Sequence, residues 1–452
     1  MNYIITKNKK YFESIGDYNY CNLEDMILTE VVAVDTETTG LNPREGDIFA
    51  IQIGTGENNY LIDCQSHNNG YIPEDVTPYL EGRTLVLNNA TFDLTFFYKH
   101  NFYPKKIHDT MVMSMILHNG KTPTYFYRHG FGYVMERELG AIYDKSAQKN
   151  IHNTQLSNAK NIEYSFNDVD RLVELAFNMW DKLKAEGTAV AYKENADFTR
   201  ALAYMENSGM PLSEERWEEK MRLDRIDYKN HKNIIIKYIF DNLPEFRETQ
   251  LDLFSDDIKI KPLLSSNDQM IPVFKALGIS TLNDEGKDSI DKSIINKSNH
   301  EFVKMWLDFK EANHAVHNQG QKILDKVENG RLYTSYNILL DTARISTRKG
   351  GINFLNFTSN ERTRRCFKAK PGFVMIGADY SGQENATTAS FTQDATMLAS
   401  INEGLDLPCA VARMIYPELE DLTDADIKKN HPDKRQASKA PRFLFAFGGS
   451  AY

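Results

Sequence analysis

The chain has 452 residues, is 41% hydrophobic and 26% charged, and carries a formal net charge of −10 at pH 7. This length suffices for two or three domains with cores of their own, and the composition is typical of an ordinary soluble protein. No apolar run approaches the roughly 20 residues that span a bilayer, and the N-terminus has no apolar signal-peptide region. The four cysteines form no CxxC pair, so neither a zinc site nor a disulfide framework is expected. We therefore expect a reducing, cytoplasmic setting and no membrane span.

The N-terminal part of the chain combines strand and helix patterns. After a weakly patterned lead-in of residues 1–30, strands are predicted over residues 31–34, 48–54, 60–63 and 84–89, and helices over residues 108–118 and 162–184. Asp35 and Glu37 project from the end of the first strand on the same side, because side chains repeat every two residues. The fourth strand runs into a helix that carries Asp93. We therefore expect an α/β domain.

Three acidic motifs follow one another in this domain: DTE at residues 35–37, NATFD at residues 89–93 and YSFND at residues 164–168. They resemble the three motifs of the DEDD family of 3′→5′ exonucleases, in its tyrosine-containing form. Each aspartate could instead be a helix cap or a turn residue, but three motifs would then have to coincide in order. The resemblance implies an RNase H-like 3′→5′ exonuclease domain over residues 1–187.

Phosphodiester hydrolysis explains why the motifs are acidic. Two divalent cations can neutralise charge on the phosphate and activate a water, and Mg²⁺ prefers oxygen ligands. The expected ligands of two Mg²⁺ ions, with Mn²⁺ as an alternative, are Asp35, Glu37, Asp93 and Asp168. The resemblance further implies that Tyr164 and Glu37 orient the attacking water. We assign Asp109 a structural role as a helix cap.

The C-terminal third carries further motifs: TARIST at residues 342–347 with NFLN at 353–356, RRCF at 364–367 with KPG at 370–372, DYSGQE at 379–384, and RxxxKxxxFxxxF at 435–447. In this order they resemble the palm and fingers of family A DNA polymerases. On its own, the apolar run at residues 373–378 predicts a buried strand that delivers Asp379, which could be a mere capping residue. The resemblance favours a metal-binding carboxylate.

The resemblance implies a role for each matching residue of the synthetic site. Asp379 would bind two metal ions, and Glu384 would lie beside the sugar of the incoming nucleotide and exclude a 2′-hydroxyl. A helix beginning near Pro432 would present four nucleotide-binding residues along one face: Arg435, Lys439, Phe443 and Phe447. The alternative for this stripe is an amphipathic helix with an aromatic core face.

Basic residues are concentrated beside these motifs, in an otherwise acidic chain. Residues 344–370 hold eight Lys and Arg against one acidic residue, and residues 428–442 hold six against one. A solvated surface is the usual alternative, but the placement favours phosphate contacts. The expected DNA-binding residues are Arg344, Asn353, Asn356 and Arg364. The expected partners are a DNA primer-template, single-stranded 3′ ends and dNTPs.

The remaining boundaries follow from the same resemblance. Residues 188–330, which look mainly helical, would form a linker helix and a thumb; residues 331–427 would form a partial palm, and residues 428–452 the start of the fingers. Together with the exonuclease domain, this is an α/β fold followed by a mainly helical thumb and a partial α+β palm. The compact layout looks phage-like, which would place the enzyme in the host cytoplasm.

The sequence departs from the family pattern in several places. Ala343 stands in place of Gly, Pro441 lies inside the fingers helix, Phe447 replaces Tyr, and Phe443 predicts discrimination against dideoxynucleotides. The second catalytic palm motif, of the His-Asp-Glu type, has no match. We therefore expect a fragment, or half of a split polymerase whose remaining palm is on a separate polypeptide, and expect this chain alone to degrade 3′ ends but not to extend a primer.

Two other functions are compatible with parts of this sequence. The first is a stand-alone 3′→5′ exonuclease with a polymerase-like remnant that only clamps DNA, but a clamp has no need of Asp379, Arg435 and Lys439. The second is a non-catalytic DNA-binding or processivity protein. The acids of the three exonuclease motifs argue against this function.

Overall fold

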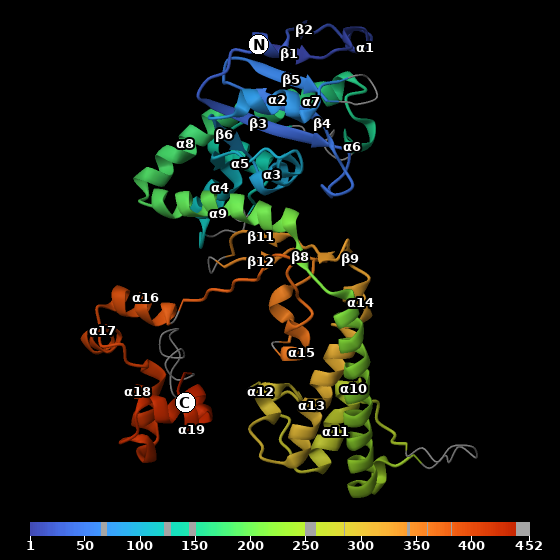
Figure 1. Ribbon diagram of the computed structural model, residues 1–452, viewed down its shortest axis with the longest axis vertical. Coiled ribbons are helices and arrows are strands. Elements are labelled where there is room, and N and C mark those ends of the chain that lie inside the picture. The colour runs from blue at the N-terminus through green and yellow to red at the C-terminus, as the bar shows by residue number, and fades with distance from the viewer. Residues whose placement is uncertain are drawn as a thin grey trace. The chain divides into compact units, whose positions relative to one another are not determined.

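The computed structural model describes residues 1–64, 70–121, 128–143, 151–248, 259–283, 285–340, 344–358, 360–380 and 382–439. It divides into two compact units, Met1–Pro371 and Gly372–Tyr452, which are described in turn (Figure 1). Among the described residues, no helix combines the length and the apolar character needed to cross a bilayer.

The first unit begins with a seven-stranded sheet in the order β2-β1-β5-β4-β3-β6-β7. Its strands are β1 (Asn2–Ile5), β2 (Asn19–Tyr20), β3 (Val31–Thr38), β4 (Ile48–Gly54), β5 (Asn59–Asp63), β6 (Thr84–Leu87) and β7 (Lys106–Asp109). Only β4 runs against its neighbours, and all other pairs in this sheet are parallel. The carboxyl ends of β3 and β6 therefore lie at the same edge of the sheet.

Helices cover both faces of this sheet. They are α1 (Lys9–Glu13), α2 (Pro73–Leu80), α3 (Ala90–Lys99), α4 (Thr110–His118), α5 (Phe131–Leu139), α6 (Ile151–Thr154), α7 (Ala159–Asp170), α8 (Leu172–Ala185) and α9 (Ala189–Ser208). Alternate residues of β3 enter different cores: Val32 and Val34 pack with α2 and α3, whereas Ala33 packs with α4, α5 and α8. A strand buried on both faces supports side chains rigidly.

Several expectations about these elements need correction. Asp35 and Glu37 lie inside β3, not beyond its end, because pairing with β4 continues past them. The stretch 108–118 begins as strand β7 and becomes helical only at Thr110, and the stretch 162–184 is broken into α7 and α8 at Arg171. The weakly patterned residues 1–30 contribute β1, which pairs with β5 along all four of its residues.

The rest of the first unit is mainly helical. It contains α10 (Glu214–Asn242), α11 (Asn267–Ala276), α12 (Lys292–Ile295), α13 (Glu301–His317), α14 (Gln321–Leu324) and α15 (Glu361–Arg364). Its short strands are β8 (Met210–Pro211), β9 (Val327–Glu328), β10 (Arg331–Leu332), β11 (Tyr336–Asn337) and β12 (Ser346–Thr347). The long helix α10 packs along α13, and Ile235, Phe302 and Trp306 are buried between the helices of this region.

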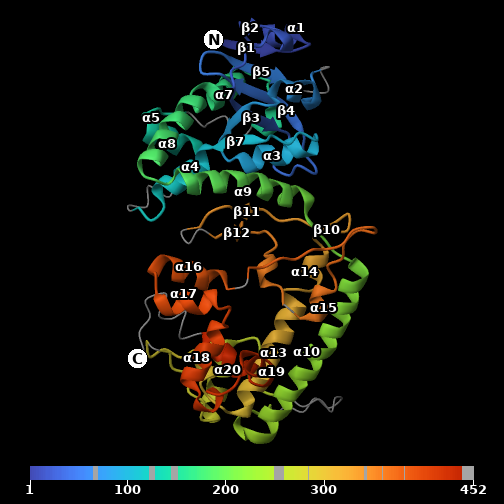
Figure 2. The same cartoon turned by 60° about the vertical axis from the view of Figure 1, so that its left-hand side comes forward.

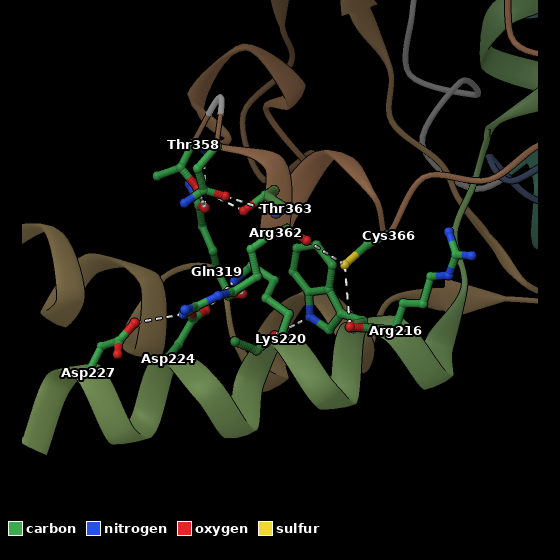
Figure 3. A network of polar contacts seen from close by, with 12 residues as sticks. Arg216, Lys220, Asp224, Asp227, Gln319, Thr358, Arg362, Thr363 and Cys366 are labelled. Atoms are coloured by element: carbon green, nitrogen blue, oxygen red, sulfur yellow. Dashed lines mark hydrogen bonds and ion pairs between the residues drawn. The ribbon is translucent and has the colours of Figure 1, made fainter.

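A partly buried polar network joins α10 to the segment that carries α15 (Figure 3). The Lys220 ammonium is 2.6 Å from Asp224 and donates to the carbonyl of Gln319 at 3.2 Å. Arg362 donates to Asp224 at 2.9 Å and to Asp227 at 2.7 Å. Arg362 belongs to the basic stretch expected to contact phosphates, but here its charge is used within the protein. A basic residue in such a stretch is therefore not always available to contact DNA.

The second unit contains α16 (Gln383–Thr392), α17 (Ala395–Asn402), α18 (Leu407–Ile415), α19 (Asp424–Asn430) and α20 (Pro432–Ala437). Its small core holds Cys409, Ala412, Leu419 and Ile427. The helix predicted near Pro432 begins there. The buried strand predicted at residues 373–378 is wrong: this segment is exposed and, among the described residues, pairs with no strand. A strand needs a partner for its backbone N–H and C=O groups, which an apolar run cannot supply by itself.

Candidate active sites

The structure brings the acids of the three N-terminal motifs to one edge of the sheet. Asp35 and Glu37 come from β3, Asp93 from the first turn of α3, which follows β6, and Asp168 from the last turn of α7. One carboxylate oxygen each of Asp35, Glu37 and Asp168 lies within 4.8 Å of the others. Asp93 lines the same cavity, which has a volume of about 220 Å³ and also includes Tyr164.

Neighbouring side chains fix two of these acids. Asp93 Oδ1 accepts hydrogen bonds from the backbone N–H and the hydroxyl of Thr36, at 3.0 and 2.6 Å. Glu37 Oε1 accepts from Gln52 on β4 at 3.2 Å and from Ser165 on α7 at 3.5 Å. Each carboxylate is thus held by an element other than its own, which pre-organises the cavity.

The electrostatics of the cavity fit a cation. Burial, followed by repulsion from Asp168 and Asp93, raises the pKa of Glu37 to about 8. Burial raises the pKa of Asp93 to about 7 and, with the neighbouring acids, holds that of Asp35 well above its usual range. Four carboxyl groups gathered in this way cannot all be ionised without a counter-charge. Their oxygen donors are the kind that Mg²⁺ and Mn²⁺ take.

Tyr164 lies one helical turn before Asp168 on α7. Burial and the neighbouring carboxylates raise the pKa of its phenol far above the usual value, and a hydrogen bond to Asp168 adds to this effect. The hydroxyl therefore stays protonated and can donate a hydrogen bond at any physiological pH.

Asp109 has the capping role expected of it, and a second role that the sequence did not predict. Its carboxylate accepts from Met111 and Val112 at the start of α4. It also accepts from the backbone N–H groups of Asn89 and Ala90, at 3.0 and 2.8 Å, where α3 begins. Through α3, Asp109 positions Asp93. Only the approach of β7 to β6 reveals this role, because the groups it joins are about 20 residues apart.

Sequence reasoning also missed the rim of the cavity. The additional lining residues are Thr38, Leu41, Asn88, Asn89, Phe92, Phe131, Ile151 and His152. Asn89 and Phe92 lie within the NATFD motif, in which the sequence assigns a role only to Asp93, and the other residues carry no pattern that marks them as a surface of the site.

A second cavity, of about 710 Å³, lies within the second unit. It is lined by Asp379, Glu384, Lys428, Arg435 and Lys439 together with residues of α16 and α18. The structure thus brings together both acids and both cations predicted for the synthetic site. Phe443, Phe447 and Pro441 lie outside the described residues, as does Ala343.

Two of the cations that line this cavity, Arg435 and Lys428, are held by Asp406, an acid that the sequence did not single out. Asp406 caps α18 through the N–H of Cys409 and accepts two hydrogen bonds from the Arg435 guanidinium, at 3.1 and 2.8 Å. Lys428 lies 3.0 Å from the same carboxylate. Burial opposes the ionisation of Asp406, but bonds from Arg435 and Lys428 outweigh it and lower its pKa well below the usual range.

The predicted DNA-binding residues lie in the first unit. Arg344 and Arg364 are exposed. Asn353 caps a short 3₁₀ helix (Phe354–Asn356) by accepting from Leu355 N–H, and the carbonyl of Asn356 accepts from Gln319. Asn353 is therefore already used in local structure.

Comparisons with known proteins match both halves of the chain. A 3′-5′ exonuclease family model matches residues 10–184, and the model of DNA polymerase family A matches residues 249–452. The chain carries a 3′-5′ exonuclease domain followed by a DNA polymerase family A domain. The exonuclease domain precedes the polymerase domain, and the strand order β5-β4-β3-β6-β7 with β4 reversed is the RNase H-like core of that domain.

Individual relatives of this polymerase are distant. DNA polymerase I of Aquifex aeolicus is 26% identical over 92% of this chain and 68% of its own length, and the DNA polymerase of Mycobacterium phage D29 is 23% identical over 93% and 70%. A solved structure, the POL domain of Pol1 from M. smegmatis in complex with DNA primer-template and dNTP, covers 93% of this chain and 68% of that chain, with a TM-score of 0.67 and 19% identity. At that identity the likeness concerns the fold.

Proposed function

We propose that residues 1–187 form a working 3′→5′ exonuclease that hydrolyses single-stranded DNA from its 3′ end. The observation that carries this proposal is the cluster of Asp35, Glu37 and Asp168, whose oxygens lie within 4.8 Å of one another, with Asp93 in the same cavity. Residues 188–330 would then serve as linker helix and thumb, residues 331–427 as palm, and residues 428–452 as the start of the fingers.

The four acids would hold two Mg²⁺ ions, or Mn²⁺ in their place. Bound there, the cations would neutralise charge on the scissile phosphate and lower the pKa of the attacking water. Glu37 would accept a hydrogen bond from this water, while the protonated Tyr164 donates one and fixes its direction. Thr36 keeps Asp93 in place through two hydrogen bonds, so the cavity needs little rearrangement when substrate enters.

The exonuclease proposal is tested with Asp168→Asn, which removes one charge and keeps the shape. Degradation of a 5′-labelled single strand in Mg²⁺ should fall by at least about a hundredfold, because losing even an outer-shell partner of a metal costs 10–100-fold. Mg²⁺ or Mn²⁺ should also raise the Tm of the wild type more than that of the variant, since the wild type binds the cation in its folded state.

The matched control is Glu163→Gln on the same helix. Glu163 is exposed, lies one residue before Tyr164 and does not line the cavity. Its variant should retain wild-type degradation and the wild-type response of Tm to the cation. Equal activity of the Asp168→Asn and Glu163→Gln variants would contradict the proposal.

For the second unit, we propose that its cavity is the nucleotide site of the polymerase. Asp379 would bind the catalytic cations, Glu384 would face the sugar of a dNTP, and Arg435 and Lys439 would bind its triphosphate, with Phe443 and Phe447 toward sugar and base. Support comes from the shared cavity of the four described residues. Binding of a fluorescent dNTP to the nuclease-deficient Asp168→Asn chain, and its loss on adding Arg435→Ala, tests this proposal.

The nucleic-acid partners follow from the same proposal. A primer-template duplex would contact the exposed Arg344 and Arg364, with Asn353 and Asn356 nearby in sequence, and the single-stranded 3′ end would enter the exonuclease cavity. Synthesis would require a second palm carboxylate motif, which this sequence does not contain, so we propose that the chain alone degrades a primer and does not extend it.

A further inference from the structure

The β11–β12 hairpin comes from the polymerase part of the sequence but packs against the exonuclease domain. Ile338 is 4% exposed and lies in the same hydrophobic cluster as residues of α4, α8 and α9. The N–H of Tyr336 donates to Glu206 on α9 at 2.7 Å. Figures 1 and 2 both show the hairpin directly beside α9. The hairpin is therefore part of the wall around the exonuclease domain.

Arg348, directly after β12, extends this contact to the rim of the exonuclease cavity. Its backbone N–H donates to Ser335 at 2.8 Å, and its Nε donates to the carbonyl of Tyr336 at 3.0 Å. Its Nη2 lies 3.5 Å from Oδ1 of Asn89. Asn89 lines the cavity and immediately precedes α3, the helix of Asp93. The side chain is thus aimed from the hairpin toward the rim.

Among the described residues Arg348 forms no direct ion pair, although its charge acts on the Glu206 carboxylate of α9 and opposes the rise that burial causes in the pKa of that group. Within the described part of the chain, no carboxylate oxygen lies within 4.0 Å of its guanidinium, and its contact at the rim is to a neutral amide. Nε and Nη2 make the two contacts given above, and a guanidinium has five N–H donors in a planar fork that matches a phosphate. Half-buried and oriented by the hairpin, this fork can bind an anion with little loss of side-chain entropy.

We propose that Arg348 binds a backbone phosphate of the single strand that enters the exonuclease cavity. This inference rests on the exonuclease function proposed above and adds to it a positioning residue supplied by the polymerase part of the chain. The carboxylate cluster repels the strand until cations are bound, so one fixed cation at the rim favours the approach of the backbone. Arg348 makes no contact with the acids themselves and acts on binding, not on the hydrolysis step.

The experiment compares Arg348→Ala with Lys349→Ala, which removes a neighbouring exposed charge. Degradation of a long oligothymidylate and of a dinucleotide is measured in Mg²⁺. For Arg348→Ala, KM for the long strand should rise about tenfold with kcat unchanged, as expected for one lost charge-assisted hydrogen bond. The dinucleotide has no phosphate besides the scissile one for Arg348 to bind, so it should be degraded as by the wild type. Arg348→Lys should recover part of the affinity, since it keeps the charge without the fork.

Salt dependence gives a second readout. Loss of one phosphate contact should reduce the slope of log affinity against log salt concentration by about 0.7 for a single strand, whereas Lys349→Ala should leave it unchanged. If Arg348→Ala matches Lys349→Ala, or lowers kcat on both substrates together with the Tm, Arg348 is only a structural link and the inference is overturned. If the wild-type chain degrades neither substrate, it is the exonuclease proposal that fails.

Discussion

At the scale of single residues, Glu138 shows how a buried charge is kept ionised away from the active site. Its side chain is 2% exposed and accepts hydrogen bonds from His118, Arg137 and Lys182, at 3.0, 3.0 and 2.8 Å. Burial opposes the charge, but the bonds from these three partners outweigh it and lower the pKa of Glu138 to about 2. Glu138 lies on α5, the helix whose first residue, Phe131, lines the exonuclease cavity.

Glu138→Gln should destabilise the exonuclease domain by on the order of 3 kcal/mol, because it leaves the partner cations facing a neutral amide. Since the folded-state pKa is depressed, the stabilisation by Glu138 is fully present above the unfolded value near 4.5 and is lost as the pH falls toward 2. Urea unfolding should therefore show a difference from the wild type at pH 7 that shrinks below about pH 4.5.

Glu136→Gln on the same helix is the control, because Glu136 is exposed and removing a surface charge changes stability by no more than about 0.5 kcal/mol. A difference between wild type and Glu138→Gln that is constant with pH would show that the ion pairs do not set the stability.

The residues of the two cavities differ in how far the sequence could predict them. The four acids lie in short motifs, so their chemistry could be recognised locally. Asp406 could not be found in this way, because it meets Arg435 from 29 residues away and its immediate neighbours look like an ordinary helix start. Asn89 belongs to a recognised motif, but its contact with Arg348, 259 residues later, exists only in the folded chain.

At the scale of elements, α10 is anchored by the network of Lys220, Asp224 and Arg362 (Figure 3). Lys220 is 2% exposed, and its ammonium also lies 4.6 Å from the centre of the Trp217 ring. Asp224→Asn should destabilise this region by about 3–5 kcal/mol, because the buried ammonium loses its carboxylate. Hydrogen exchange should show faster opening of the start of α10 and of residues 360–366.

Two further variants serve as comparisons for this prediction. Lys220→Met should cost less than Asp224→Asn, because Asp224 would still be paired with Arg362. Asp241→Asn, which breaks the exposed pair with Lys237 on the same helix, should have an effect of no more than about 1 kcal/mol. Equal exchange rates in the Asp224→Asn and Asp241→Asn chains would show that the network does not hold α10.

The local pattern of apolar residues predicts a strand correctly where the segment is both buried and paired with a neighbouring strand. Strands β4 and β5 are fully buried, lie beside each other in the sheet, and were found within one residue of their bounds. Residues 373–378 are equally apolar, but among the described residues no strand pairs with them, and Ile376 is 88% exposed. Conversely, the sequence did not predict β1, because polar and apolar residues alternate only weakly along its four positions. Its pairing with β5 decides its structure. Strand formation depends on partners that a sequence window does not contain.

At the scale of the whole molecule, the two sites differ in how complete their acid sets are. The exonuclease cavity gathers four carboxylates from β3, α3 and α7. In the cavity of the second unit, Asp406 is occupied by Arg435 and Lys428, and Asp379 is the carboxylate that we propose binds the catalytic cations. Because two cations in synthetic geometry need more than one such carboxylate, the two sites should have different competence in this chain.

The purified 452-residue chain, given primer-template, dNTPs and Mg²⁺, should shorten the primer and not lengthen it. Degradation could hide slow synthesis, so the decisive measurement uses Asp168→Asn, in which the exonuclease is disabled. With this variant the primer should keep its length over long incubation. Extension should appear when a polypeptide carrying a His-Asp-Glu palm motif is added, and should disappear again with Asp379→Asn. Primer extension by the Asp168→Asn chain alone would refute the prediction, because it would require the acids of the second unit to suffice for synthesis.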